Sequence, residues 1–500
     1  MSEKFLRILA YVGILFPFSR AKMQKILKFS LLLPIFALSI CFYSPNSFSA
    51  QQKLPTSVQK ALKKNHLSSR QLAVSVRPLD GGKVKLNWRA SQKVSPASTE
   101  KIITTLAALE TLGPNWRWRT QYLTDEPMDD GVIDGPLYIR GGGDPTYVIE
   151  RLWRDLSAMK AQGLEKIRGD IVIDRTLFAT DKTSVQFGEE VHRPYMKEAD
   201  AALINYQAVT LHFEPDYEKG IAHITTTPAL KGFEAPKTVK LVSTNANCVG
   251  WRHALKLNLK NEWEPTFDGG FPKSCPAKDL SYIFSNPESY WQALLEPLLD
   301  EMDISWRGDV VKGVIPDKAN PLYTAYSDDL VNVSRLTNKF SNNVLARHIY
   351  LTLGLIANDE KSGADYPMAR SALQNWLTQS VKVKPGTVYV DNGSGLSRES
   401  FVTASAMTQI IAYGWKSPRM PEWVSTFPVS ATDGTMRRRQ VAPGSAYIKT
   451  GLLNGVKSVA GVIQAKSGKR YAIFGVVEGD RATSTDAPLD AVIQWVFLKG

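Results

Sequence analysis

The sequence has little cysteine and little histidine. Three cysteines and six histidines occur in 500 residues, and no spacing among them matches a zinc finger or another metal site. We therefore expect no metal and no other cofactor. Phosphate-loop and dinucleotide-binding glycine patterns are also absent, so we interpret Gly141–Gly143 as part of a tight turn. Among the histidines we expect His348 to lie on the surface of a helix.

Long apolar runs are absent after residue 49, so no later segment can span a bilayer. Residues 1–49 instead predict an export leader, because two lysines precede the apolar run 29–43 and small polar residues follow it. Cleavage is expected after Ser49, and an uncleaved membrane anchor is the alternative. The leader predicts a periplasmic protein. Only Cys248 and Cys275 remain after the leader, and an even pair in an exported chain favours one disulfide.

Acidic residues are scarcer than basic ones, 48 against 61, which gives a net charge of +13. The excess is not concentrated in a dense basic block, so we expect no nucleic-acid partner. A mildly cationic surface suits an anionic polymer or a membrane face. The length of 500 residues predicts two or three domains.

The periodicity of apolar residues divides the chain into three regions of different predicted secondary structure. Alternating residues predict a hairpin over 70–90, directly before a helix at 96–112. Short strands and loops rich in Gly, Pro and Asn dominate from 123 to 318, with helices at 148–162 and 289–300. Later segments predict one sheet shared by the early hairpin and late strands at 446–478, with a terminal helix. Helices are also predicted at 328–340, 343–353, 404–414 and 485–498.

Ser98 and Lys101 lie three residues apart at the start of the predicted helix 96–112. That spacing puts them on one helical face, where a buried lysine that loses its proton can activate a serine hydroxyl. The helix N-terminus adds positive potential where an oxyanion would form. The pattern also occurs at Ser19/Lys22, Ser57/Lys60 and Ser157/Lys160, which we interpret as solvated surface.

Two later patterns complete a candidate site. Ser341 and Asn343 flank Asn342 on the connection between two predicted helices, although Ser341 alone could simply cap the second helix. Lys449-Thr450-Gly451 ends a predicted strand, where lysine and threonine can bind a carboxylate. The glycine would let a substrate backbone lie alongside the strand.

In this order the three motifs resemble the signature of penicillin-recognising serine enzymes. The long gap between the first two resembles the class C low-molecular-mass penicillin-binding proteins, a D-alanyl-D-alanine carboxypeptidase/endopeptidase family. Further matching stretches are 142–146, 391–398, 433–435 and 459–461. The resemblance implies an α+β fold, a serine β-lactamase/DD-peptidase-like transpeptidase domain with an antiparallel sheet flanked by helices. It would comprise residues 50–122 and 319–500, and a mostly β insert of two small subdomains would occupy 123–318.

The resemblance also implies a role for each motif residue. Ser98 would be the acylated nucleophile, Lys101 its base, and Ser341 the group that passes a proton to the leaving amine. Asn343 would hold the substrate amide. Lys449 and Thr450 would bind the terminal carboxylate, beside Gly451, and the backbone N–H groups of Ser98 and Leu452 would form the oxyanion hole. Leu452 departs from the family pattern, where many relatives have Ser or Thr.

The predicted activity is that of a serine-type D-Ala-D-Ala carboxypeptidase, a DD-endopeptidase, or both, acting on peptidoglycan peptides. β-Lactam antibiotics would be covalent inhibitors, and a homodimer is one alternative for the oligomeric state. A serine β-lactamase is the first alternative function, but no water-activating glutamate can be assigned, since Glu399 lacks supporting context. A catalytically weak wall-binding protein with the same fold is the second.

Overall fold

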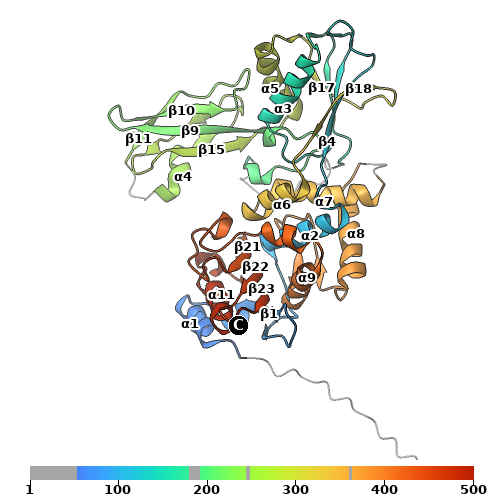
Figure 1. The fold of residues 1–500 in the computed structure, drawn as a ribbon. Coiled ribbons are helices and arrows are strands. Elements are labelled where there is room, and N and C mark those ends of the chain that lie inside the picture. The colour runs from blue at the N-terminus through green and yellow to red at the C-terminus, as the bar shows by residue number, and fades with distance from the viewer. Residues whose placement is uncertain (1–52, 180–191, 244–247, 360–362) are drawn as a thin grey trace, which may run out of the picture. The chain divides into compact units, whose positions relative to one another are not determined.

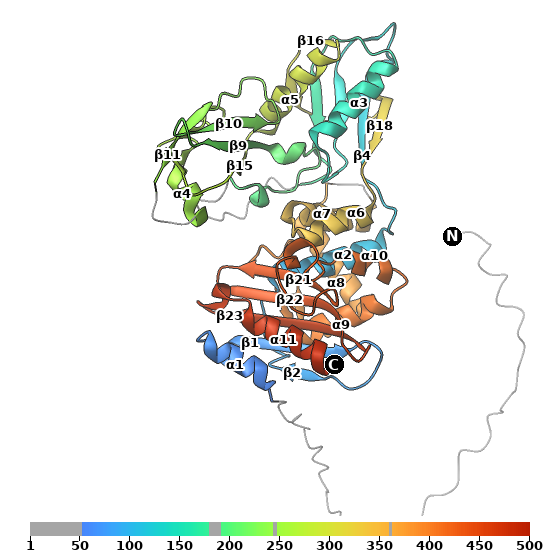
Figure 2. The same cartoon turned by 60° about the vertical axis from the view of Figure 1, so that its left-hand side comes forward.

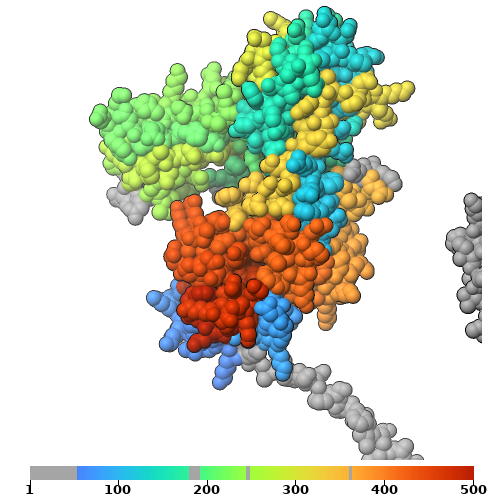
Figure 3. Space-filling view, in the orientation of Figure 1, coloured from blue at the N-terminus to red at the C-terminus, as the bar shows by residue number. Residues whose placement is uncertain are grey.

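The two ends of the described chain form neighbouring helices. The computed structural model describes residues 53–179, 192–243, 248–359 and 363–500, so the predicted leader lies outside it. Helix α1 (Thr56–Lys64) packs beside the terminal helix α11 (Ala487–Lys499), and the space-filling view shows this N-terminal segment in blue next to the red C-terminal one (Figures 1 and 3). Within the described ranges, no helix has the length and apolar character needed to cross a bilayer.

A five-stranded antiparallel sheet joins early and late segments, in the order β2–β1–β23–β22–β21. The sequence predicts this arrangement. Alternate residues of a strand face opposite sides of a sheet, so Ile473 packs with α1 and α11 while its neighbour Phe474 packs with the helices of the other face. Strand β21 ends the order. The strands are β1 (Leu72–Pro78), β2 (Leu86–Trp88), β21 (Ala446–Leu453), β22 (Val456–Gln464) and β23 (Arg470–Glu478).

Helix α2 (Lys101–Thr111) is the centre of a helical layer on one face of this sheet. Its residues from Lys101 to Leu109 are all buried. Four surrounding helices begin at a polar side chain that accepts a hydrogen bond from the first turn, a strong helix-start signal. The layer also contains α6 (Leu330–Lys339), α7 (Asn343–Ala357), α8 (Tyr366–Trp376), α9 (Ala404–Lys416) and α10 (Met420–Ser425).

Between α2 and α6 the chain forms two further five-stranded sheets (Figure 2). The first has the order β17–β8–β6–β4–β18, and the second has the order β14–β11–β10–β9–β15. One hydrophobic cluster includes residues of both sheets and of helices α3 and α5. The elements are β4 (Arg119–Thr124), β6 (Leu137–Arg140), α3 (Ile149–Ala161), β8 (Ile171–Asp174), β9 (Ala208–Asp216), β10 (Ile221–Thr227), β11 (Thr238–Val242), α4 (Trp251–Leu255), β14 (Phe271–Pro272), β15 (Lys278–Ile283), α5 (Pro287–Glu301), β17 (Val310–Lys312) and β18 (Asn320–Tyr326).

The remaining strands are short pairs and triples. Two of these groups lie in the inserted region, and in the third, β19–β20–β3, the strand just before α2 pairs with strands from the later part of the chain. The predicted insert boundaries fall within β4 and just before β18, two strands that pair with each other. The division into domains stays a prediction. The short strands are β3 (Lys93–Val94), β5 (Val132–Ile133), β7 (Lys166–Ile167), β12 (Leu257–Asn258), β13 (Thr266–Phe267), β16 (Ser305–Trp306), β19 (Val388–Tyr389) and β20 (Phe401–Thr403).

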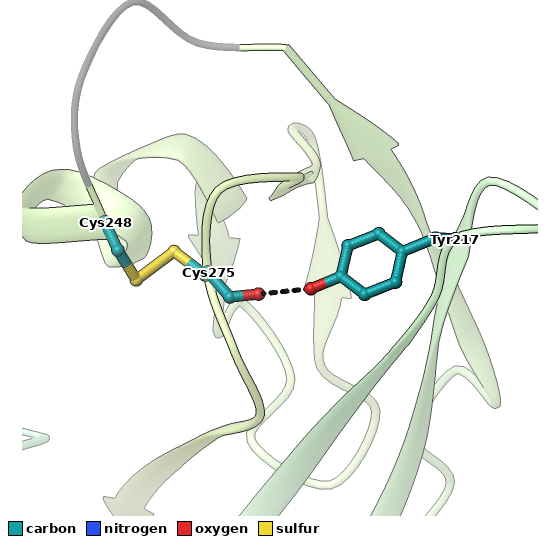
Figure 4. Close-up of a disulfide and its surroundings, with 3 residues drawn as sticks. All are labelled: Tyr217, Cys248 and Cys275. Carbon is teal, nitrogen blue, oxygen red and sulfur yellow. Dashed lines mark hydrogen bonds between the residues drawn. A yellow bond between two sulfur atoms is a disulfide. The ribbon is translucent and has the colours of Figure 1, made fainter.

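A disulfide joins Cys248 to Cys275, as the sequence predicts (Figure 4). It links the segment that leads into α4 to the turn before β15. The hydroxyl of Tyr217, at the end of β9, donates to the carbonyl of Cys275 at 3.2 Å. The cross-link therefore connects the polar loops at one end of the second sheet.

Candidate active site

Ser98 lies at the start of the buried helix. It belongs to a single 3₁₀ turn, η2 (Ala97–Glu100), which continues directly into α2 at Lys101. Ala97 has a φ of +45°, a left-handed conformation that residues other than glycine rarely adopt. Ser98 is partly exposed, whereas the Lys101 side chain is completely buried. The turn therefore presents the serine hydroxyl at the surface and the amine beneath it.

The Lys101 amine joins three elements. Its Nζ lies 2.9 Å from Ser98 Oγ and donates to Asn343 Oδ1 at 2.7 Å and to the carbonyl of Ser394. An amide oxygen and a carbonyl can only accept. A neutral amine therefore uses both of its N–H groups on Asn343 and Ser394, and its lone pair faces the hydroxyl of Ser98. In that state the hydroxyl of Ser98 donates a hydrogen bond to the Lys101 nitrogen.

The surroundings of Lys101 favour the neutral amine. Burial lowers its pKa well below the ordinary value. The positive charge of Lys449 lowers this pKa further, the carboxyl of Glu100 raises it, and Arg347 lowers it. Only the neutral form can accept a proton from Ser98. The site can therefore activate a serine nucleophile without a histidine.

The loop between α6 and α7 supplies Ser341 and Asn343. Ser341 has a φ of +60°, and Asn343 is the first residue of α7. The side chain of Asn342 accepts from the N–H of Leu345 at 3.1 Å, so Asn342 is the N-cap of α7. The alternative that Ser341 caps this helix is wrong, because Asn342 already occupies that position. The Ser341 hydroxyl is free to face strand β21.

Strand β21 brings Lys449 and Thr450 to the same place. Lys449 Nζ donates to Ser341 Oγ at 2.9 Å and to the carbonyl of Thr450 at 2.6 Å. Burial lowers the pKa of Lys449 to about 7. The Thr450 hydroxyl donates to the Thr435 hydroxyl at 2.8 Å, so the stretch 433–435 also contributes to this corner. Serine, lysine and asparagine groups from the three sequence motifs thus meet in one cluster.

Gly451 has a packing role that differs from the predicted one. A Cβ added there would lie 2.2 Å from Ser458 Oγ and 2.9 Å from the carbonyl of Pro96. Ser458 itself donates to that carbonyl at 2.6 Å. The absence of a side chain at Gly451 therefore lets β21 and β22 pack against the turn that contains Ser98. Leu452, the next residue, is 59% exposed.

Gly395 packs against the same turn from another side. It has a φ of +74°, and a Cβ there would lie 1.9 Å from the carbonyl of Ala97. The turn over 392–395 therefore contacts the backbone at Ser98 closely. That approach is what brings the Ser394 carbonyl to the Lys101 amine.

Glu100 is a site residue that the sequence analysis did not identify. It is completely buried, and its Oε1 accepts from the N–H of Gly395 at 3.0 Å. Burial raises its pKa to about 7. The sequence does contain a signal for Glu100, because this acidic residue lies between Ser98 and Lys101 at the start of a mostly apolar helix. Ser394 was also missed as a site residue, because it contributes a backbone carbonyl rather than its side chain.

The prediction that His348 lies on a helix surface is wrong. Its imidazole is fully buried on α7, with Nδ1 2.9 Å from the carbonyl of Gly143. Nδ1 must therefore carry the proton, and Nε2 can accept from the N–H of Asp200 at 3.4 Å. Burial lowers the pKa of His348 to about 4. The residue is a neutral structural link between α7 and the Gly141–Gly143 segment.

A segment of the inserted region also contacts α7. The Nδ2 group of Asn343 donates to the carbonyl of Tyr195 at 3.2 Å. Arg347, fully buried on the same helix, donates to the carbonyls of Met196 and Lys197 and pairs with Glu198 at 3.3 Å. Residues 195–198 therefore lie against the helix that carries Asn343. In the part of the chain that the structure describes, no group of His, Cys, Asp and Glu side chains is arranged to hold a metal ion.

Comparison with known proteins gives similarities along almost the whole chain. A sequence model described as the D-Ala-D-Ala carboxypeptidase 3 (S13) family matches residues 54–498. The curated D-alanyl-D-alanine carboxypeptidase DacB of Haemophilus influenzae is 24% identical over 473 residues, which cover 91% of this chain and 94% of the relative.

The fold is similar to that of solved penicillin-binding proteins. The crystal structure of penicillin binding protein 4 from Haemophilus influenzae gives a TM-score of 0.73 at 21% identity, covering 87% of this chain and 97% of that one. A structure of the same protein complexed with a β-lactam gives 0.70 at 22% identity, covering 88% and 98%. These values show a shared fold over both chains.

Proposed function

The chain belongs to the S13 family of D-Ala-D-Ala carboxypeptidases, and from this premise we propose that Ser98 is its acylated nucleophile. The protein is a serine-type hydrolase of that family. One observation carries the proposal. The buried amine of Lys101 lies 2.9 Å from Ser98 Oγ, and its two acceptor partners hold it there.

Acylation would begin with proton transfer from Ser98 to Lys101. The oxygen of Ser98 would form a bond to the carbonyl carbon between the two D-alanines of the substrate. The backbone N–H groups of Ser98 and Leu452 would stabilise the oxyanion. The C–N bond would then break as Ser341 relays to the leaving nitrogen the proton that Lys101 took from Ser98, so that the terminal D-alanine departs and Lys101 is neutral again.

Deacylation would use the same amine. A water molecule would add to the ester carbon as Lys101 accepts one of the water protons. Breaking the ester bond would return a proton to Ser98 and release a peptide with a new D-alanine carboxylate. Asn343 supports this role, because its Oδ1 fixes the Lys101 amine. Its Nδ2 donates one hydrogen to the carbonyl of Tyr195 and would offer the second to a substrate carbonyl.

Lys449 and Thr450 would bind the carboxylate of the substrate. The pKa of Lys449 is about 7 in the free enzyme because of burial, and an adjacent carboxylate would favour the ammonium form. The exposed Thr450 hydroxyl pair with Thr435 offers a second donor. This arrangement favours substrates that end in a free carboxylate, and a cross-linked peptide would be cleaved by the same steps.

Glu399 does not supply the separate water-activating base that the β-lactamase alternative needs. Glu399 is exposed, and its backbone N–H donates to the side chain of Ser397. Its carboxylate has no hydrogen bond to Ser98. We therefore propose that β-lactams acylate Ser98 and that the resulting acyl-enzyme is hydrolysed slowly. Since the predicted leader precedes a wall hydrolase, we also propose that the protein acts on peptidoglycan peptides in the periplasm.

Digestion of purified muropeptides tests the proposed function. Wild-type enzyme should release free D-alanine from pentapeptide stems, and mass spectrometry of the products will also count cleaved cross-links. Ser98→Ala should release none, whereas Ser157→Ala should behave as wild type. D-alanine release by the Ser98→Ala variant at the wild-type rate would refute the assignment.

A further inference from the structure

The second sheet of the inserted region carries a cavity of about 740 Å³ that has no role in the chemistry at Ser98. Small-molecule sites in proteins have volumes of roughly 300–1,000 Å³. The walls come from the loop at residues 192–193, from the segment 252–260 after α4 begins, and from β15. Backbone hydrogen bonds join the first segment to β15, and the second segment to residues 268–270.

Backbone hydrogen bonds hold the walls in place. The N–H of Ile283, at the end of β15, donates to the carbonyl of His192 at 3.0 Å. The N–H of Asp268 donates to the carbonyl of Lys256 at 3.2 Å, next to the pairing of β12 with β13. The cavity therefore has a rigid lining rather than a chance gap between side chains.

Basic side chains outnumber acidic ones in the lining. Asp268 is the one acidic residue among those that form it. Burial lowers the pKa of Arg252, and the nearby positive charge of Arg193 lowers it further. The two guanidinium groups are therefore close enough to repel each other. The basic residues are His192, Arg193, Arg252, His253, Lys256 and Lys260.

These basic groups differ from others in the same region. Arg175 forms ion pairs with Asp200 and Glu288, and Lys231 pairs with Glu296. In the described ranges no carboxylate forms an ion pair with any of the six basic residues that line the cavity. Several cations gathered around a hollow without anionic partners form a site for an anion.

The lining also has an apolar part. Leu257, Leu259 and Leu280 contribute to the wall, together with the ring of Tyr282. A bare inorganic anion would fill only a small part of this volume and leave those side chains without contacts. Cations beside aliphatic walls fit a ligand that has both carboxylates and methyl or methylene groups, as a short peptide does.

The chain connects the cavity directly to the candidate active site. Arg193 precedes Tyr195 by two residues, a span of at most about 7 Å, and the carbonyl of Tyr195 accepts from Asn343. We propose that the cavity binds a carboxylate-bearing peptide of the wall polymer while another peptide of the same polymer occupies the site at Ser98. This inference rests on the proposed function, which supplies a polymer whose peptides end in carboxylates.

The binding test uses the full chain with Ser98→Ala, so that ligands are not turned over. The probe is a soluble peptidoglycan fragment with several peptides, and its dissociation constant is measured by titration calorimetry at fixed ionic strength. Neutralising two cations with Arg193→Gln/Arg252→Gln should weaken binding roughly tenfold or more, since each charge-assisted hydrogen bond contributes substantially. Lys256→Gln/Lys260→Gln, at exposed positions, provides a second variant.

The matched control removes two exposed lysines that do not line the cavity, with Lys240→Gln/Lys273→Gln. It should bind the fragment as Ser98→Ala alone does, and a fragment with amidated carboxylates should bind about as weakly as the arginine variant. Equal binding by all correctly folded variants, judged by their melting temperatures, would overturn the proposal. Displacement of the fragment by an equal concentration of inorganic phosphate would also overturn the assignment to carboxylates. Release of D-alanine by the wild-type enzyme, measured separately, tells whether the proposed function itself fails.

Discussion

The Lys449 amine donates to the hydroxyl of Ser341 at 2.9 Å, although the two residues are 108 positions apart. The contact connects β21 to the loop between α6 and α7. Because Ser341 accepts this hydrogen bond, its own O–H remains available to donate toward the leaving nitrogen of a substrate. One lysine thus contacts Ser341, while Lys101 contacts Ser98.

Acylation by penicillin should occur on Ser98. The amine of Lys101 can take the proton of Ser98, and the β-lactam carbonyl replaces the peptide carbonyl as the electrophile. Intact-mass measurement should show one stable adduct on the wild-type protein and none on Ser98→Ala.

The other serines in Ser-x-x-Lys patterns serve as controls. Ser57→Ala on α1 and Ser157→Ala on α3 should be labelled as the wild type is. Equal labelling of wild type and Ser98→Ala would mean that the nucleophile has been assigned to the wrong residue.

Glu100→Gln should move the acid limb of the acylation rate to lower pH. Acylation requires neutral Lys101, so the rate falls as pH falls through the pKa of this amine. The negative charge of Glu100 raises that pKa, and its removal should lower it. Glutamine can still accept from the N–H of Gly395, so the turn should keep its place.

The pH profile separates this electrostatic role from a structural one. Lys101 and Asp391 are the charged groups that act on Glu100, and Tyr350 also lies within its influence. Glu100 is ionised only above its pKa of about 7, so the two profiles should separate where Glu100 is charged and Lys101 still titrates. They should converge once Lys101 is neutral in both proteins. A loss of rate by the same factor at every pH would instead indicate a structural role. Glu399→Gln, at an exposed position, is the matched control.

Local sequence patterns were sufficient to predict most helices and strands near the site. Apolar periodicity predicted α2, and alternation predicted the hairpin of β1 and β2. His348 was misjudged because α7 is buried along almost its entire length. A helix that is buried on every face has no polar stripe in its sequence, so the pattern does not show whether a single histidine is exposed.

Contacts between distant segments explain what the sequence could not predict. Gly395 packs against Ala97 although the two are far apart in the sequence, and no local sequence pattern relates them. Glu100 and the Ser394 carbonyl become part of the site only through that approach. In contrast, the motif residues were predictable because their side chains are the reactive groups.

The disulfide should leave no free thiol in the exported protein. Cys248 and Cys275 are bonded, and Cys41 lies in the predicted leader. Alkylation of the unfolded protein without a reductant should therefore add no mass. A loop of 27 residues suggests a stabilisation of about 3 kcal/mol, to be compared by urea unfolding with and without the disulfide. Alkylation of both cysteines before reduction would contradict this prediction.

Thr450 and Lys449 should together recognise the free carboxylate of the substrate. Lys449 is buried beside Ser341, and Thr450 is half-buried on β21 with its hydroxyl bonded to that of Thr435. A charge-assisted hydrogen bond contributes about 1.5–3 kcal/mol. Converting the substrate carboxylate to an amide should therefore lower kcat/KM by about 10- to 100-fold.

Thr450→Val tests whether the threonine hydroxyl makes that contact. The variant should lose a similar factor on the free acid and little more on the amide, because both changes remove one interaction. Losses that add fully on the amide would show that Thr450 does not touch the carboxylate. The same comparison on a cross-linked dimer, with products counted by chromatography, extends the test to endopeptidase cleavage, since that substrate also presents a carboxylate at the corresponding D-centre.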